Sequence, residues 1–147
     1  MPPLTTNERI RAVEAIIDYE FVDNTLLERA LEAAGASFVS QGNKRLALIG
    51  DAALRLVLYE ASYESGYSIE QITKSQNTLA TNENLSQIGF RLGINAYIGL
   101  NPSAQGFIPG RLMATTVEAI IGAVYLDSNK DVSRASLLTV HLGILAQ

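Results

Sequence analysis

The sequence predicts an all-α fold, on three observations. Apolar residues recur at the three- and four-residue spacing that places side chains on one face of a helix. Helix-capping signatures precede several of these runs, and the alternation typical of strands is nearly absent. The 147 residues have the length of one ordinary domain, so we expect a single domain over residues 1–147.

Two helices are predicted in the N-terminal part of the chain. Thr5 followed three residues later by Glu8 forms a capping box, which places the start of a helix at Thr5. After a short turn, a second helix is expected over residues 24–33. Asn24 is a suitable cap for it, and apolar residues form its inner face.

The longest predicted helix, 43–63, follows a loop at 35–42. Its apolar residues cover nearly the whole circumference, which is typical of a helix at the centre of a fold. The apolar surface of such a helix is larger than a small monomer can bury. Part of its surface, including Leu48, is therefore expected to pack against a second copy of the chain in a two-fold homodimer.

Similar signals mark the starts and ends of the remaining predicted helices. Ser68 and Gln71 form a second capping box, for a helix that runs to about residue 80. Glycine and proline residues after residue 100 indicate a loop. The other predicted helices span 82–92, 113–126 and 132–142.

Composition and charge limit the classes of function. The chain has no cysteine and a single histidine, His141, which excludes disulfides and argues against a histidine-based triad. Its net charge is −4, so any RNA contact is expected to use a local basic face. No apolar run approaches the ~20 residues of a membrane span. We expect an intracellular protein, cytoplasmic by default, with an organelle or the nucleus left open.

Two acidic residues stand inside the two most apolar predicted helices. Asp51 lies in the run LALIGDAAL, and Glu118 lies in ATTVEAIIGAV. An ionised carboxylate in apolar surroundings is costly unless it is paired or bound to a metal. Gly50 and Gly122 lie near these acids and allow a second helix to approach closely. We therefore expect the two helices to cross there and to bring Asp51 and Glu118 together.

From the residues alone, a structural polar cluster and a functional site are equally supported. Arg55 lies four residues after Asp51, a spacing that suits an ion pair within the helix. Glu118 has Lys44 or Arg111 as a candidate partner, or a buried hydroxyl group. Ion-pair networks also produce buried charges, so burial does not separate the two interpretations.

The segments around both acids resemble the two signature motifs of the ribonuclease III family. Residues 43–54 read NKRLALIGDAAL, where the family has the form NERLEFLGDAVL. Residues 114–127 read ATTVEAIIGAVYLD, where the family resembles ADxxEAxxGAxYLD. The likeness covers nearly the whole chain, and two long motifs in the right order are a specific signal.

This resemblance implies an all-α nuclease domain that forms a homodimer and acts on double-stranded or structured RNA. Four acids bind Mg²⁺ in the family, and the metal activates a water for cleavage. Asp51 and Glu118 match two of these ligands and are the expected catalytic and metal-binding residues. Ala47 and Thr115 stand where the other two ligands are expected. Lys44 replaces the first glutamate of the first motif.

These replacements leave two interpretations of function. The chain is either a divergent endoribonuclease of RNA processing, with Mg²⁺ or Mn²⁺ as cofactor, or an inactive pseudo-nuclease without one. The second would serve as a dimeric RNA-binding or ribonucleoprotein component, or as a scaffold for a protein partner. The missing ligands favour it over an unmodified nuclease. In that case, we hypothesise that the Lys44 ammonium group neutralises Asp51 and Glu118 in place of the metal.

The resemblance also bears on how the chain would contact RNA. The family usually carries a double-stranded-RNA-binding domain after the nuclease domain, and a chain that ends at Gln147 is expected to be a short form without it. RNA contact is then expected to rest on Lys44, Arg45 and Arg111, mainly through phosphate and 2′-hydroxyl groups. Other basic residues, such as Lys74, are interpreted as solvated surface charges.

Overall fold

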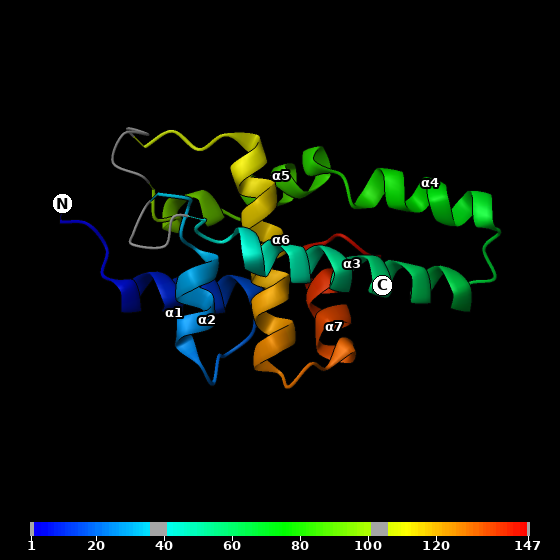
Figure 1. Cartoon of the computed structure of the whole chain (residues 1–147), viewed down its shortest axis with the longest axis horizontal. Coiled ribbons are helices and arrows are strands. Elements are labelled where there is room, and N and C mark those ends of the chain that lie inside the picture. Colours follow the sequence, from blue (N-terminus) through cyan, green and yellow to red (C-terminus); the bar gives the residue numbers. More distant parts are fainter. Residues whose placement is uncertain (1, 36–40, 101–105, 147) are drawn as a thin grey trace.

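The computed structural model describes residues 2–35, 41–100 and 106–146, and every regular element in these ranges is a helix (Figure 1). The predicted all-α class is therefore confirmed. A single β-bridge, between Glu32 and Gly99, is the only strand-like pairing among the described residues. In chain order the helices are α1 (Thr6–Ile17), α2 (Asn24–Ala30), α3 (Lys44–Glu64), α4 (Ile69–Leu79), α5 (Asn82–Arg91), the 3₁₀ helix η1 (Ile94–Tyr97), α6 (Gly110–Asp127) and α7 (Val132–Leu142).

Local capping signals predicted the helix starts well. Thr5 caps α1 and Ser68 caps α4, each in a capping box as predicted, and the hydroxyl of Thr81 accepts a hydrogen bond from a backbone N–H at the start of α5. Because these bonds join residues three apart, they depend on sequence that can be read directly. The helix predicted from residue 113 begins earlier, at Gly110. Residues 36–40 and 101–105, which fall in predicted loops, lie outside the described ranges.

Helix α2 begins at Asn24 as predicted, but its predicted cap and its predicted end were wrong. Its cap is Asp23, whose carboxylate accepts a hydrogen bond from the backbone N–H of Thr25, rather than Asn24. The helix ends at Ala30 instead of residue 33. The backbone N–H of Ala33 donates instead to the carbonyl oxygen of Gly99, 2.8 Å away. A contact with a segment far along the chain therefore ends this helix.

The central helix is α6 rather than α3. Residues 119–124 of α6 are all buried, so this stretch is enclosed on every side. Helix α3 lies across α6 (Figure 1) and is buried along one face, while Leu48 and Leu56 are 74% and 44% exposed. Residues 43–63 are therefore not enclosed on every side within one chain, and the exposed Leu48 belongs to the surface that was expected to pack against a second copy.

The backbones of α3 and α6 touch where the helices cross. A Cβ atom added at Gly50 would overlap the carbonyl oxygen of Glu118, and would lie 2.6 Å from its carbonyl carbon. A Cβ atom added at Gly122 would overlap the carbonyl oxygen of Leu46. The predicted close approach at these glycines is therefore confirmed.

The C-terminal end of α6 holds the connection between α1 and α2. The carboxylate of Asp127 accepts hydrogen bonds from the Tyr19 hydroxyl (2.8 Å) and from the backbone N–H groups of Val22 (2.9 Å) and Asp23 (2.8 Å). Burial, with the hydrogen bond and charge of Asp127, raises the pKa of Tyr19 to about 12. The acid that ends the second signature motif therefore has a structural role.

Helix α4 follows the C-terminal half of α3 at one end of the molecule (Figure 1), and residues of α7 line a hollow together with that same half of α3. None of the residues of α4 is buried. None of the helices in the described part of the chain is long and apolar enough to cross a membrane.

Because α3 and α6 cross so closely, one added methyl group at the crossing should strongly lower the stability of the fold. Gly50→Ala should lower the free energy of unfolding by about 3 kcal/mol or more, because its Cβ meets backbone that cannot move without separating α3 from α6. Denaturant unfolding measures this. The matched control is Gly110→Ala, whose Cβ meets the flexible Ser86 hydroxyl at 3.1 Å and should change stability by less than about 1 kcal/mol. Equal effects of both substitutions would contradict the tight crossing.

Candidate functional site

Asp51 and Glu118 lie together where α3 crosses α6, and their side chains share a hydrogen bond. This is the convergence that the two embedded acids and their neighbouring glycines predicted. Both side chains are partly buried, and Asp51 retains 34% of its exposure. The pair is therefore open to solvent on one side and set against the helix crossing on the other.

The environment favours a protonated Glu118. Burial raises the pKa of Glu118 to about 8, the hydrogen bond and charge of Asp51 act in the same direction, and Arg55 opposes them. At neutral pH the pair therefore holds a proton, and a protonated carboxyl group can donate the hydrogen bond that joins the two acids. A shared proton reduces the repulsion between two adjacent carboxylates.

Arg55 provides the positive charge at this pair. Its Nε lies 3.3 Å from both Oδ1 and Oδ2 of Asp51. The intrahelical pairing proposed from the four-residue spacing is thus confirmed, and the structure places Arg55, rather than Lys44, beside the acids. Lys44 lies seven residues before Asp51, which is about 10 Å along the helix.

Residues 47 and 115, where the resemblance led us to expect two further acids, add little to the donor set. Ala47 is buried and offers only a methyl group. The hydroxyl of Thr115 donates a hydrogen bond to the carbonyl oxygen of Arg111, 2.9 Å away, within its own helix. The described residues contain no group of three or more histidine, aspartate or glutamate side chains that could hold a metal ion.

The three residues predicted to contact RNA lie on the same two helices as the acids. Lys44 and Arg45 are exposed in the first turn of α3, and Arg111 is exposed in the first turn of α6. By helical spacing, Lys44 shares a face with Asp51, and Arg111 shares a face with Glu118. Each lies about two turns from the acid on its own helix, and none of the three forms an ion pair with either acid.

A structural residue that the sequence analysis missed is Asn43. Its side chain is buried, and its Nδ2 donates to the carbonyl oxygen of Ala30 (2.8 Å) and to the hydroxyl of Thr116 (3.0 Å). These two bonds join the end of α2, the start of α3 and the middle of α6. The signal available was an asparagine beside a helix start, which predicts a cap, whereas no side-chain cap bond forms here.

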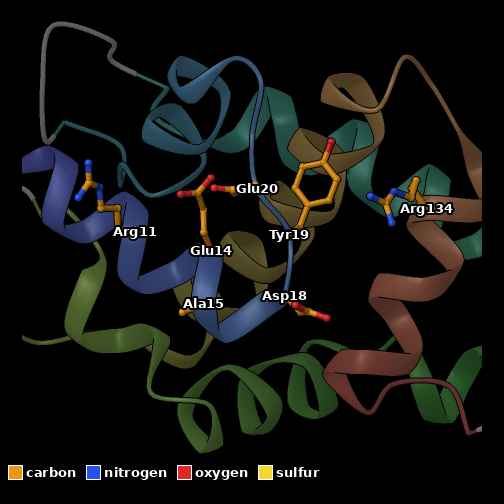
Figure 2. A pocket seen from close by; sticks show the side chains of 7 residues that line it. All are labelled: Arg11, Glu14, Ala15, Asp18, Tyr19, Glu20 and Arg134. Atoms are coloured by element: carbon orange, nitrogen blue, oxygen red, sulfur yellow. The ribbon is translucent and has the colours of Figure 1, made fainter.

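A charged hollow that the sequence did not predict lies between the end of α1 and α7 (Figure 2). Its volume is about 780 Å³, and its lining is seen in Figure 2, with Arg11 and Glu14 on α1 and Arg134 on α7. Glu14 already accepts a hydrogen bond from the backbone N–H of Phe21, and Arg134 lies over the ring of Tyr19 at 5.4 Å. Its lining includes neither Asp51 nor Glu118, so it is separate from the carboxylate pair.

Comparison with known proteins identifies the family. A model of the ribonuclease-III-like family matches residues 23–142, and the chain belongs to this family. Ribonuclease 3 of Shewanella sediminis is 34% identical over 135 residues, which cover 88% of this chain and 59% of that protein. Ribonuclease 3 of Idiomarina loihiensis is 32% identical over 142 residues, covering 93% of this chain and 58% of that protein. The chain thus spans less than two thirds of the length of these relatives.

Solved structures show the same fold. A structure of the nuclease domain of ribonuclease III from Campylobacter jejuni superposes with a TM-score of 0.82 at 26% identity, covering 90% of this chain and 94% of that one. It is described as flexible in a region involved in dimer formation of that domain. A second structure of the same nuclease domain gives a TM-score of 0.81. The predicted ribonuclease III-like helical fold is therefore confirmed.

The raised pKa of Glu118 makes stability depend on pH. Protonation of Glu118 stabilises the folded chain; this contribution is fully present below the ordinary pKa of 4.5 and is lost as the pH rises through about 8. Glu118→Gln mimics the protonated form at every pH, so its stability relative to the wild type should increase as the pH rises from about 4.5 to about 8 and stay level above that. Denaturant unfolding across this pH range measures the difference. Glu60→Gln, at an exposed position of α3, controls for the loss of one charge. A difference that does not change with pH would contradict the raised pKa.

Proposed function

We propose that this chain is a ribonuclease III-like domain that binds double-stranded or structured RNA as a homodimer, without cleaving it by the metal-dependent route of its family. The observation that carries the proposal is the carboxylate pair. Asp51 and Glu118 stand where the family holds metal, but a shared hydrogen bond and the Arg55 guanidinium group already satisfy them.

The residues present do not fit a Mg²⁺ site. Magnesium demands near-octahedral oxygen coordination and uses ionised carboxylates to offset its charge. Here one carboxylate is paired with arginine and the other favours its protonated form. Ala47 supplies no oxygen, and the hydroxyl of Thr115 is engaged with the backbone of α6. We therefore assign no catalytic step to a metal at this site.

The basic residues support RNA as the ligand. Lys44, Arg45 and Arg111 are exposed, and none forms an ion pair within the described residues. Such charges can contact the phosphates of a duplex, which is recognised mainly by shape, phosphate and 2′-hydroxyl groups. Family membership supports duplex RNA over other polyanions, since both relatives are named ribonuclease 3.

An apolar stripe on α3 supports the homodimer. The stripe consists of Leu48, Ala52, Leu56, Tyr59 and Tyr63, which are exposed and share one face of the helix by their spacing. An exposed apolar patch of this kind marks an interaction surface. A two-fold dimer would bury it against the same stripe of a second copy. The related Campylobacter jejuni domain is described as having a region involved in dimer formation.

A divergent endoribonuclease is the second candidate function. It is favoured by the convergence of two carboxyl groups at a partly exposed site, since Asp51 and Glu118 both match family ligands. A protonated Glu118 beside an ionised Asp51 is also an arrangement that suits general acid–base chemistry. Cleavage by this route would need no metal ligand at Ala47 or Thr115. A scaffold for a protein partner is the third possibility, in which neither RNA binding nor cleavage is found.

RNA binding is tested with a long duplex by fluorescence anisotropy, and cleavage is followed on the same RNA with Mg²⁺ and with Mn²⁺. We expect binding that weakens with salt, without cutting. Combined Lys44→Ala, Arg45→Ala and Arg111→Ala substitutions should weaken binding roughly tenfold to hundredfold by removing phosphate contacts. Lys74→Ala, at an exposed position of α4, is the matched control and should change binding little.

Each other outcome identifies a different function. Cutting that is abolished by Glu118→Ala would overturn the pseudo-nuclease proposal and establish the endoribonuclease. Absence of both binding and cutting would leave the scaffold. Binding that is unchanged in the combined variant would remove the basic residues from the proposal.

The dimer is tested by light scattering coupled to size-exclusion chromatography. The wild-type chain should have the mass of a dimer, and Leu48→Asp should shift it to a monomer, because it places a charge within the apolar stripe. Leu137→Asp, at an exposed leucine of α7 outside the stripe, is the control and should remain dimeric. A wild-type monomer at all concentrations, or dissociation by the control substitution alone, would contradict the proposed interface.

A further inference from the structure

The position of Arg55 suggests more than an ordinary surface ion pair. Its Nε contacts both carboxylate oxygens of Asp51 at 3.3 Å. The side chain of Asp51 also shares a hydrogen bond with Glu118, so its oxygens are engaged by two groups. The guanidinium group therefore stands against the pair of acids that match the metal ligands of the family.

We propose that Arg55 is a built-in counter-ion that takes the place of a divalent cation at the Asp51–Glu118 pair. A bound metal ion would have to displace the guanidinium group from Asp51 and would be repelled by its positive charge. This inference goes beyond the proposed function, because it concerns the affinity of the site for metal and holds whether or not the chain binds RNA.

No other cation of the site is placed to do this. Lys44 and Arg111 each lie seven residues, or about 10 Å, from the acid on their own helix. Arg45 lies six residues, or about 9 Å, from Asp51 along α3, and it forms no ion pair with either acid. The hypothesis that Lys44 neutralises the acids is accordingly replaced by Arg55, whose four-residue spacing brings it into contact.

The test measures binding of Mn²⁺ alone, by electron paramagnetic resonance of the free ion. Arg55→Ala should bind Mn²⁺ at least about tenfold more tightly than the wild type. The substitution removes a positive charge that repels the metal ion, and it frees the Asp51 carboxylate to bind Mn²⁺. Adding Asp51→Asn to Arg55→Ala should abolish the gain. Lys74→Ala removes one positive charge at an exposed position of α4 and should leave Mn²⁺ affinity at the wild-type level.

Two outcomes would overturn the proposal. One is equal Mn²⁺ affinity of the wild type and Arg55→Ala. The other is an equal gain in Lys74→Ala, which would reflect net charge alone. Arg55 is 58% exposed, so its removal should leave the fold intact, and the circular dichroism of each variant checks this. Because no RNA is present, failure here is distinguishable from failure of the proposed function.

A second set of variants restores the missing acids. Ala47→Glu with Thr115→Asp adds two carboxyl groups, and Arg55→Ala is then added to the pair. If Arg55 is the counter-ion, the triple variant should bind Mn²⁺ at least about tenfold more tightly than the double variant. Equal affinities of the double and triple variants would overturn the proposal. Ala47 is buried, so if Ala47→Glu prevents folding, the comparison of the wild type with Arg55→Ala decides alone.

Discussion

The contact between the backbones of α3 and α6 is the constraint on which the rest of the structure depends. Gly50 lies against the carbonyl group of Glu118, and Gly122 lies against that of Leu46, so the two helices approach as closely as their main chains allow. This approach leaves α6 enclosed at the centre of the fold. It also brings a carboxyl group from each helix to one point. The same two glycines thus account for both the packing and the candidate site.

Two acids at such a crossing must be neutralised, and the number of acids decides how. Four adjacent carboxylates would carry a larger negative charge, and binding a divalent metal is one way to offset it. With two, a proton on Glu118 and the guanidinium group of Arg55 are sufficient. The replacements at residues 47 and 115 and the position of Arg55 are therefore parts of one electrostatic arrangement.

Sequence reasoning succeeded where the determining contacts are local or where the residue type is unusual for its place. The capping boxes at Thr5 and Ser68 join residues three apart, and an acid beside a glycine in an apolar helix indicated the crossing. It failed where a segment far along the chain decides where a helix ends. Helix α2 is an example, because the residues that follow it bond to Gly99. It also could not tell which of α3 and α6 is enclosed within one chain, because an exposed apolar stripe and a core face have the same composition.

The arrangement at the crossing has a consequence for an acidic chain that is proposed to bind RNA. A site with four unneutralised carboxylates would repel phosphate groups, and the metal that the family binds removes that repulsion. Replacing two of the acids and pairing a third with Arg55 reduces the repulsion without a metal. The exposed cations Lys44 and Arg111 then stand on the faces of α3 and α6 that lead to this neutralised site. On this argument, the absence of acids at residues 47 and 115 is compatible with the proposed RNA binding, because fewer carboxylates present a lower electrostatic barrier to the duplex.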